Sequence, residues 1–519
     1  MSAVVRVRRT VRERSDAIFL IEPGRDISLT YGETWKASGR LAATLAHMGV
    51  GEGDRVALTL PNGAELACAY FACTAIGALV VPLDMKSHES SIAHIVSSTS
   101  PAVIVTGDET DTSYAALEGS EAGSVSITLT PADAGSETLN LTDGPDSEFE
   151  PFPAGSDDRP WSITHTSGTT SAPKGVVHSA QTLLGNALAF EDRVHAGPDA
   201  RYLDLFQMSY MAGFLNSLLC PLVSGGSVVI APAFGPMSAL TFWSEVRAQS
   251  VTHMWLSPTM LRMVQSLDRD PDNAEFARTH IKGVYACTAP LALEDKLAFE
   301  SRYGVPIRQS YGTSEQLILT LNDVDGPAMG VGRPLGGVDI EIRGDGDLPL
   351  PMGSEGELYL RTQYEQLGYF GPGYSPVGKE RFAMWIETGD VGIVAADGAV
   401  SITGRKKDLI IKGGANISPE AVESVALSED SVVECAAVGI PDATYGEVVG
   451  LAVLLQDGAT LTESKLALAE RFRDGLSANQ QPTYLMQFNE LPRTSNGKVL
   501  RRDVKAAFLE RIDEAETLR

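Results

Sequence analysis

Short apolar runs alternate along most of the chain with longer segments whose apolar residues recur at helical spacing. GDRVALTLP at 53–61 precedes AELACAYFACTAIG at 64–77, which in turn precedes ALVVPL at 78–83. The alternation continues with THMWLSP at 252–258, TMLRMVQSL at 259–267, IKGVYACTAP at 281–290, LEDKLAFESRYG at 293–304 and PIRQSYGTSE at 306–315. Strands and helices that alternate in this way predict an α/β fold with doubly wound, largely parallel sheets.

The pattern changes after Gly336, where short strands are punctuated by Gly and Asp. VDIEIRGDGDLP at 338–349, EGELYLRT at 355–362 and GIVAADGAVSITG at 392–404 are typical of a small β subdomain. A compact α/β pattern begins near residue 406. A chain of 519 residues is longer than a domain with a single hydrophobic core usually is. We therefore expect a large N-terminal domain over 1–404 and a small, mobile α+β C-terminal domain over 405–519.

The stretch THTSGTTSAPKGVVHS at 164–179 is rich in hydroxyl groups and glycine. Such residues form poor helices and poor cores, so the stretch predicts a loop, with a strand before it at 160–164 and a helix after it at 180–190. Backbone N–H groups, hydroxyls and one Lys can together surround phosphate oxygens. Pro173 and Gly175 break the pattern of the common nucleotide P-loop, so a different ATP-binding design is implied.

The formal net charge of −26 disfavours nucleic acid or an anionic membrane surface as a partner. Segment 87–158 contains no Lys or Arg. Cations gather instead in two C-terminal groups: Arg405, Lys406, Lys407 and Lys412, then Arg493, Lys498, Arg501 and Arg502. In so acidic a chain this clustering indicates a polyanionic ligand such as ATP, although solvated basic faces are the usual outcome of charge runs.

The five cysteines form no CxxC pair and stand in apolar surroundings, which favours reduced, buried thiols and a cytoplasmic protein. The Arg-rich N-terminus lacks the apolar segment of a signal peptide. The uncharged stretch 205–244 is interrupted by Asn216, Pro221 and Pro232, so it predicts helix, turn and strand in a large core instead of a membrane span. His165 and His178 are expected to be hydrogen-bonded polar residues at the edge of the loop.

Six motifs follow one another in an order that lone matches would not produce. They are the loop at 164–179, SYGTSE at 310–315, GELYLR at 356–361, ETGD at 387–390, GRKKDLIIKGGANISP at 404–419 and PRTSNGK at 492–498. With this ordered set, the chain resembles the adenylate-forming superfamily of acyl-CoA synthetases, luciferases and peptide-synthetase adenylation domains. The likeness runs almost from end to end.

The resemblance implies a two-step reaction. A carboxylate attacks the α-phosphorus of Mg·ATP to give an acyl-adenylate and pyrophosphate, and a thiol then displaces AMP. Because the first step joins two anions, charge neutralisation and positioning must carry much of the catalysis.

The resemblance also implies roles for single residues. The β- and γ-phosphates would be wrapped by Thr166, Ser167, Gly168, Thr169, Thr170, Lys174 and Gly175. Tyr311 would stack on adenine, Ser314 would touch the α-phosphate, and Glu315 would bind Mg²⁺. Asp390 and Arg405 would hold the ribose. Lys498 would bridge ATP and the substrate carboxylate.

Members of this superfamily rotate the small C-terminal domain between the two half-reactions. Lys407 matches the hinge position. One face then presents Lys498, and the other presents the KGGAN loop, where Gly413 and Gly414 leave room for the pantetheine arm of CoA or of a carrier protein. A plain hairpin turn would explain the same glycines.

The expected acid pocket contains Tyr210, Met211, Phe214, Cys287 and Thr288. Tyr210 stands at the aromatic gate, where many acyl-CoA synthetases have His, and Cys287 and Thr288 stand where Gly and Ala often open a long tunnel. These differences favour a shorter pocket for an aryl or short-to-medium acyl acid. Segment 205–244 lacks an acidic residue, which disfavours free α-amino acids. Core packing explains the same residues almost as well.

The leading hypothesis is a carboxylic acid–CoA ligase, a monomer or homodimer, with ATP, Mg²⁺ and CoA as cofactors and a small-molecule acid as its partner. Three alternatives stay open. The first is a stand-alone adenylation enzyme that loads a separate carrier protein. The second activates nitrite with ATP for reaction with an arylamine, and the third is a non-catalytic adenylate-binding protein.

Overall fold

The computed structural model describes residues 2–84, 86–107, 122–129, 138–142, 150, 152–153, 155–166, 173–232, 234–324, 326, 330–376, 378–493 and 499–518. Its chain forms two compact units. The first comprises Met1–Asp339 and Arg361–Met384, and the second comprises Ile340–Leu360 and Trp385–Arg519. The domain boundary expected between residues 404 and 405 stays a prediction.

Two large sheets form the first unit, within the described residues. The first has the strand order β16 (Arg333–Pro334), β15 (Leu317–Leu321), β14 (Ile307–Thr313), β13 (Gly283–Ala286), β12 (His253–Leu256), β10 (Arg201–Asp204), β11 (Ser227–Ile230), β1 (Ile18–Glu22) and β2 (Ile27–Thr30). From β14 to β1 all neighbouring strands are parallel. Antiparallel pairs occur at both edges.

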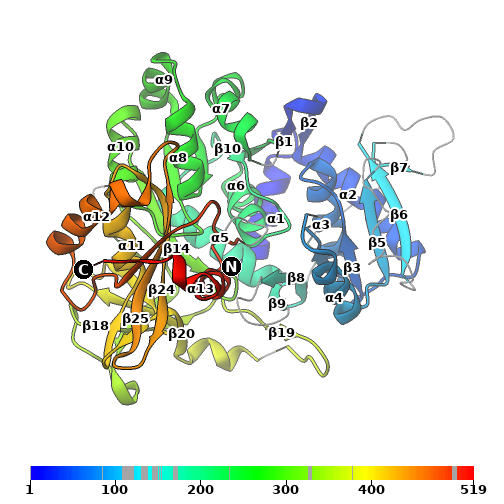
Figure 1. The fold of residues 1–519 in the computed structure, drawn as a ribbon. Helices are drawn as coiled ribbons and strands as arrows, with labels where there is room; N and C mark the ends of the chain where they lie inside the picture. The colour runs from blue at the N-terminus through cyan, green and yellow to red at the C-terminus, as the bar shows by residue number, and fades with distance from the viewer. Residues whose placement is uncertain are drawn as a thin grey trace. The chain divides into compact units, whose positions relative to one another are not determined.

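The second sheet has the order β19 (Gly368–Phe370), β9 (Lys174–Ser179), β8 (Pro160–Thr166), β4 (Leu79–Pro82), β3 (Arg55–Leu58), β5 (Val103–Gly107), β6 (Gly123–Thr128) and β7 (Leu139–Asn140). It is parallel from β8 to β7 and antiparallel at the β8–β9–β19 edge. Figure 1 shows β3, β5, β6 and β7 side by side near α2, α3 and α4. The expected α/β fold with doubly wound sheets is confirmed.

The helices of the first unit are α1 (Ala3–Glu13), α2 (Tyr31–His47), α3 (Ala64–Ile76), α4 (Glu89–Thr99), α5 (Ala180–Val194), α6 (Cys220–Ser224), α7 (Pro236–Ala248), α8 (Pro258–Leu267), α9 (Asp272–His280) and α10 (Leu293–Tyr303). Local chemistry explains several of their starts. The side chains of Thr30, Ser179 and Ser257 accept hydrogen bonds from backbone N–H groups in the first turns of α2, α5 and α8. Such caps satisfy donors that would otherwise lack a partner.

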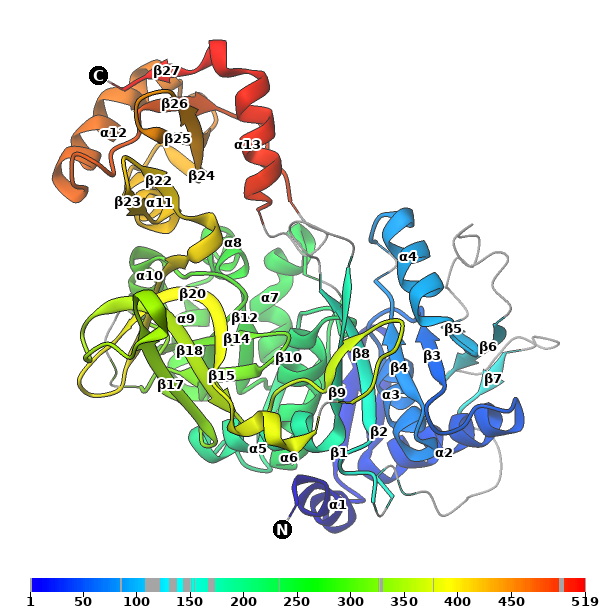
Figure 2. The same cartoon turned by 90° about the horizontal axis from the view of Figure 1, so that it is seen from below.

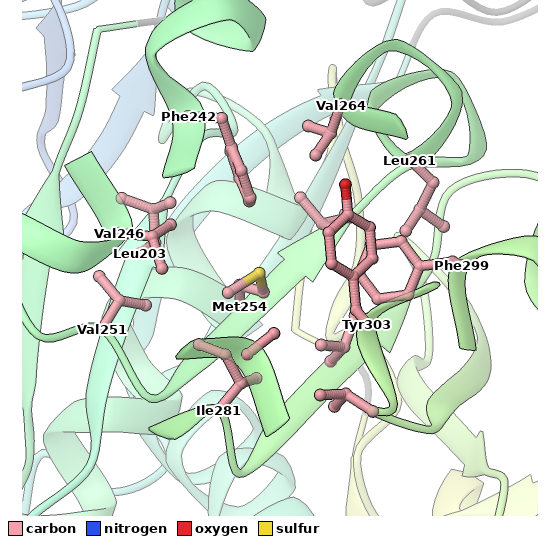
Figure 3. Close-up of a cluster of buried hydrophobic side chains, with 14 of the residues drawn as sticks. Leu203, Phe242, Val246, Val251, Met254, Leu261, Val264, Ile281, Phe299 and Tyr303 are labelled. Atoms are coloured by element: carbon pink, nitrogen blue, oxygen red, sulfur yellow. The ribbon is translucent and has the colours of Figure 1, made fainter. Parts of the chain in front are cut away.

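The core of the first sheet is one cluster of buried apolar side chains. Figure 3 shows Leu203 and Met254 of β10 and β12 facing Phe242 of α7, Leu261 of α8 and Phe299 of α10. Burying a side chain of this size contributes about 1.5 to 3 kcal/mol relative to leaving it exposed. This packing fixes the carboxyl ends of the parallel strands, where α/β proteins place their ligands.

The uncharged stretch 205–244 folds within this unit as expected. It contains a π-helix at Ala212–Leu219, the short helix α6, strand β11 and the start of α7. None of the helices built from described residues combines the length and apolarity that crossing a membrane requires. All five cysteines are buried.

The second unit begins with an antiparallel sheet in the order β17 (Val338–Arg343), β18 (Glu355–Thr362), β20 (Ile386–Val394) and β21 (Val400–Arg405). These strands are the ones that the Gly- and Asp-punctuated pattern predicts. A second sheet has the order β23 (Ala415–Ile417), β22 (Ile410–Lys412), β25 (Gly446–Leu455), β26 (Tyr484–Gln487) and β27 (Glu516–Thr517), with β24 (Val432–Asp442) paired to β25.

Helices cover both faces of this second sheet. Helices α11 (Pro419–Leu427) and α12 (Leu461–Gly475) pack on one face through Val422 and Leu468, and α13 (Arg501–Glu510) packs on the other through Phe508. Figure 2 shows α12 and α13 on opposite sides of β24–β26. The described residues after β21 therefore combine helices and strands, as the sequence predicts for the C-terminal region.

A fully buried carboxyl group, that of Asp204, ends strand β10. Its Oδ1 accepts a hydrogen bond from Phe206 N at 3.2 Å, and its Oδ2 lies 3.4 Å from Asn62 Nδ2. Burial raises the pKa of Asp204 to about 8, so the acid is mostly neutral at pH 7. A folded pKa above the unfolded value gives stability that is complete below about pH 4 and is lost as the pH rises through about 8.

We therefore expect Asp204→Asn to raise stability at pH 8, because the amide keeps the shape of the acid and never ionises. The gain should be on the order of 1 to 3 kcal/mol at pH 8 and should shrink as the pH falls toward about 4. Melting temperatures of wild type and variant measured from pH 5 to 9 test this. Parallel curves across that range would mean that Asp204 does not titrate in the folded protein.

Candidate active site

The predicted phosphate loop joins two antiparallel strands. Residue pairs run along β8 and β9 from Pro160 opposite Ser179 to Thr166 opposite Lys174. The sequence predicts the strand before the loop and the helix after it, and both are confirmed, but it places no strand between loop and helix. Segment 174–179 becomes β9 because its backbone pairs with β8 on one side and β19 on the other.

Part of this loop falls outside what the structure describes. Ser167, Gly168, Thr169 and Thr170 lie outside the described residues, and of Thr166 the structure describes the backbone. Their phosphate-binding roles stay predictions. The hairpin itself places the two ends of the loop, Thr166 and Lys174, opposite each other.

Packing alone requires a glycine at position 175. A Cβ atom on Gly175 would lie 2.7 Å from Cγ2 of Ile163 and 3.1 Å from Nε2 of His165. Real Cβ atoms do not approach side chains so closely in a sheet, so any larger residue would separate β8 from β9. The glycine therefore brings these strands together, and contact with phosphate stays a prediction.

An aromatic ring lies between two of the predicted site residues. The Lys174 ammonium lies 5.3 Å from the ring centroid of Tyr369. The Tyr369 hydroxyl donates to Oε1 of Glu315 at 3.0 Å. Tyr369 is absent from the residues singled out in the sequence, and the signal that could have found it is the aromatic pair in LGYF at 367–370.

The turn that carries Ser314 and Glu315 connects β14 to β15, and a buried histidine holds its backbone. Burial lowers the pKa of His178 to about 4, so the imidazole is neutral. Its Nε2 lies 2.8 Å from the carbonyl oxygen of Ser314, and because a carbonyl accepts, Nε2 carries the proton. The hydroxyl of Thr182 lies 3.4 Å from Nδ1. The expectation that His178 is a hydrogen-bonded polar residue is confirmed.

A buried amide holds the next part of the same turn. Asn186 of α5 donates to the Ile318 carbonyl at 2.8 Å and accepts from the Ile318 N–H at 3.0 Å. The preceding residue, Leu317, has φ = 64°, in the left-handed region. A non-glycine residue there costs roughly 1 to 2 kcal/mol, so the paired hydrogen bonds of Asn186 stabilise a strained turn.

His165 differs from its expected state. Its Nδ1 atom is buried and has no hydrogen-bond partner among the described residues, so the prediction of a satisfied polar residue is wrong for that atom. Burial lowers the pKa of His165 to about 4. The ring therefore stays neutral beside the loop, and its position opposite Gly175 shows that it fills space between the strands.

Tyr311 is half-buried in β14 opposite Thr320. Ser314 and Glu315 are also half-buried, at the carboxyl end of that strand. The described part of the chain holds no group of three or more His, Cys, Asp or Glu side chains that could bind a metal ion. A single carboxylate fits Mg²⁺ nonetheless, because Mg²⁺ commonly takes one or two carboxylates together with substrate phosphates and water.

In the second unit, the predicted ribose ligands Asp390 and Arg405 meet. They are opposite each other on β20 and β21, and Arg405 Nε lies 2.9 Å from Asp390 Oδ1. Asp390 is 3% exposed. The arrangement places a buried carboxyl group beside a cation, and carboxylate oxygens accept hydrogen bonds from hydroxyl groups.

The other predicted residues of the second unit lie on its loops. Lys407 is in the 3₁₀ turn Lys406–Asp408, directly after β21. Gly413 and Gly414 have φ of 60° and 85° in the turn between β22 and β23, which requires glycine for a tight hairpin. Lys498 lies outside the described residues. An antiparallel bridge pairs Arg493 with Val499, one residue on either side of segment 494–498.

The predicted acid-pocket residues divide between the core and an open surface. Phe214 is buried, and its ring stacks on that of Tyr70 with 4.0 Å between the ring centroids. Met211 is also buried. The Tyr210 hydroxyl donates to Asp84 Oδ2 at 2.8 Å. This contact ties the predicted gate to the loop after β4.

Cys287 and Thr288 follow β13. Asn216 of the π-helix donates a weak hydrogen bond to Cys287 Sγ at 3.9 Å, and burial raises the pKa of that thiol to about 12. Thr288 is exposed with φ = 76°, which is rare for a β-branched residue. Such strain concentrates at functional sites.

Known proteins resemble the chain over most of its length. The model of the AMP-binding enzyme family matches residues 7–370, and the model of the AMP-binding enzyme C-terminal domain matches residues 421–498. A sulfoacetate–CoA ligase of Cupriavidus necator is 29% identical over 96% of both chains. An oxalate–CoA ligase of Arabidopsis thaliana is 30% identical over 93% of this chain and 94% of its own. The crystal structure of ATP-bound MatB from Rhodopseudomonas palustris superposes with a TM-score of 0.84, at 24% identity over 98% and 99% of the two chains.

The Asp390–Arg405 pair generates a prediction. Asp390→Ala should weaken ATP binding by about tenfold or more, because a charge-assisted hydrogen bond is worth about 1.5 to 3 kcal/mol. The fold should survive, since Arg405 is partly exposed and can be solvated. Calorimetric titration with ATP and a melting curve test both halves. The matched control is Glu514→Gln, which breaks an exposed ion pair with Arg511. Unchanged affinity, or collapse of the fold, would make Asp390 a structural residue.

Proposed function

Because the chain belongs to the family of AMP-binding enzymes and is an AMP-forming acid–CoA ligase, we propose that it activates an aryl or short-to-medium acyl acid. The ligase reaction has two steps, adenylation of the acid with ATP and transfer of the acyl group to CoA. The observation that carries the assignment of residues is the shared contact of Lys174 and Glu315 with Tyr369. It places a cation and a carboxylate together at the end of the phosphate loop.

In the first step, a carboxylate oxygen of the acid forms a bond to the α-phosphorus of ATP, and the bond between that phosphorus and the bridging oxygen breaks to release pyrophosphate. Negative charge grows on the leaving group. Lys174 would offset it at the phosphates, and Glu315 would hold Mg²⁺ with the phosphate oxygens. Preorganised charges of this kind stabilise a transition state most where they need not move during the reaction.

In the second step, the thiol sulfur of CoA attacks the acyl carbonyl carbon, a C–S bond forms, and the C–O bond to AMP breaks. The thiol proton leaves with the nucleotide phosphate or with water. Asp390 and Arg405 would retain AMP through its ribose while this happens. The turn at Gly413 and Gly414 would admit the pantetheine arm, since neither position carries a side chain.

Three observations support a short acid or an aryl acid. The Cys287 thiol, which accepts a hydrogen bond from Asn216, is buried directly after β13, where no glycine opens space. The relatives named above are ligases of sulfoacetate and oxalate, both two-carbon acids. Described side chains of the stretch 205–232 and 234–244 include no carboxylate that could pair with an α-ammonium group.

A pyrophosphate-release screen over aryl and acyl acids, run with and without CoA, tests the proposal. We expect release with a short or aryl acid and formation of the CoA thioester when CoA is present. Release without a thioester would indicate a different acceptor, such as a carrier protein. The absence of pyrophosphate release with every acid of a broad panel would overturn the proposal.

Lys498 generates a prediction that separates the half-reactions. Lys498→Ala should lower adenylation by at least about 100-fold, the scale of losing one preorganised charge, and leave thiolysis of a supplied acyl-adenylate within a few-fold. The reason is that Lys498 should face the reacting atoms in one closure alone. Lys465→Ala, which breaks an ion pair with Glu516, is the control for loss of a lysine in the same unit. Equal loss of both half-reactions would contradict two closures.

The pocket generates a second prediction. Cys287→Gly should shift preference toward longer acids, because overfilled apolar sites reject longer ligands by a clash that costs about 1 to 3 kcal/mol. The original substrate should lose contacts worth on the order of 1 kcal/mol. AMP release measured over a chain-length series tests this, with Cys73→Ala as a buried cysteine outside the pocket. If the variant shows the same dependence on acid chain length as wild type, or if wild type already prefers long-chain acids, Cys287 is a core residue without a role in substrate choice.

A further inference from the structure

We propose that Tyr369 is a positioning residue for adenylation, which holds Lys174 with its ring and Glu315 with its hydroxyl so that both charges await Mg·ATP without neutralising each other. This inference rests on the proposed function, since it concerns residues assigned there to phosphate and Mg²⁺. Tyr369 itself needs no contact with the substrates. Its role is to orient the two groups that make those contacts.

The two contacts of Tyr369 differ in kind. The Lys174 ammonium lies 5.3 Å from the ring centroid, within the range of a cation–π interaction. Such an interaction orients the ammonium and leaves its full charge available to a phosphate. A carboxylate at the same place would cancel that charge.

The hydroxyl of Tyr369 acts on the other charge. It donates to Oε1 of Glu315 at 3.0 Å. A phenol that donates to a carboxylate fixes the direction of that side chain, and the hydrogen bond occupies one oxygen. The second oxygen, Oε2, is then available for a hard cation such as Mg²⁺.

The backbone of the segment before Tyr369 is tied to both partners. Gln366 N donates to the Glu315 carbonyl at 2.8 Å, and Leu367 N donates to the Val177 carbonyl at 2.7 Å. Tyr369 itself lies opposite Val176 in the β9–β19 pair, two residues from Lys174. Because Glu315, Tyr369 and Lys174 share this framework, the phenol ring is held at a fixed place between the two charges. Its 45% exposure shows that it serves no core.

Two variants separate the functions of ring and hydroxyl. Tyr369→Phe keeps the ring and removes the hydrogen bond to Glu315, and Tyr369→Leu removes both contacts. Titration calorimetry with ATP, without any acid, is run once with excess Mg²⁺ and once with EDTA. This readout does not depend on turnover.

We expect Tyr369→Phe to raise the Kd for Mg·ATP by about 3- to 10-fold, the scale of one hydrogen bond, and to leave the Kd for metal-free ATP within about twofold. Tyr369→Leu should raise both values, because Lys174 then loses its orientation as well. The split between the two conditions is the signature of a positioning role. A merely structural residue would change both conditions alike in both variants.

Tyr374→Phe is the matched control. The Tyr374 hydroxyl is buried without a hydrogen-bond partner among the described residues, and its ring centroid lies 5.4 Å from that of Phe370, the last residue of β19. This variant should bind ATP like wild type in both conditions. Equal effects of Tyr369→Phe with and without Mg²⁺, or no effect of either Tyr369 variant, would overturn the proposal. A wild type that binds no ATP would overturn it too, whereas ATP binding without AMP release on any acid would overturn the proposed function alone.

Discussion

The hydrogen bonds from one continuous segment to the turn between β14 and β15 are the constraint on which the site in the first unit depends. That segment is β9 followed by α5. Its His178 holds the Ser314 carbonyl, and its Asn186 holds both backbone groups of Ile318. The side chains of His178 and Asn186 are fully buried, and an unpaired donor or acceptor there costs about 1 to 3 kcal/mol. The turn that carries Glu315 therefore cannot move independently of the hairpin that carries Lys174.

This coupling explains why the turn can tolerate strain. Leu317 has a left-handed backbone, and a Cβ atom on Gly312 would lie 2.2 Å from the Leu317 carbonyl oxygen. An isolated turn with these features would relax. Here the paired hydrogen bonds of Asn186 outweigh the cost, because both of its groups are satisfied by the strained residue's neighbour. Rigid placement of Ser314 and Glu315 is the result, and fixed charges are what phosphoryl chemistry requires.

The sequence predicts the α/β class well, because helical and strand periodicities alternate over hundreds of residues and each buried run leaves a clear apolar signature. Strand β9 is not predicted from the sequence. Its residues come directly after Pro173 and run straight into the capped helix α5, so the strand is set by pairing with β8 and β19. The role of Tyr369 is not predicted either, because it too depends on contacts between distant parts of the chain. Tyr369 lies 54 residues after Glu315 and far from Lys174 in the sequence, so no local sequence pattern indicates either contact.

The basic residues of the C-terminal region are mostly paired within their own unit. The sequence associates their clustering with a polyanion, and that role stays a prediction. Six of the described members are held by groups of the same unit: Arg405 by Asp390, Lys406 by Glu357 and Glu387, Lys412 by the Asn479 carbonyl, Arg493 by Glu434, Arg501 by Glu420 and Glu423, and Arg502 by Asp503. Paired charges of this kind contribute little long-range attraction.

Lys174 contrasts with these cations, since it forms no ion pair with any of the described residues and rests on an aromatic ring. A lysine in an acidic chain would lower its energy by finding a carboxylate. Its contact with a ring leaves the Lys174 ammonium without a carboxylate partner among the described residues, which would suit the phosphate contact predicted for it. In a protein of net charge −26, such a cation would attract a phosphate more strongly than cations that are already paired with carboxylates.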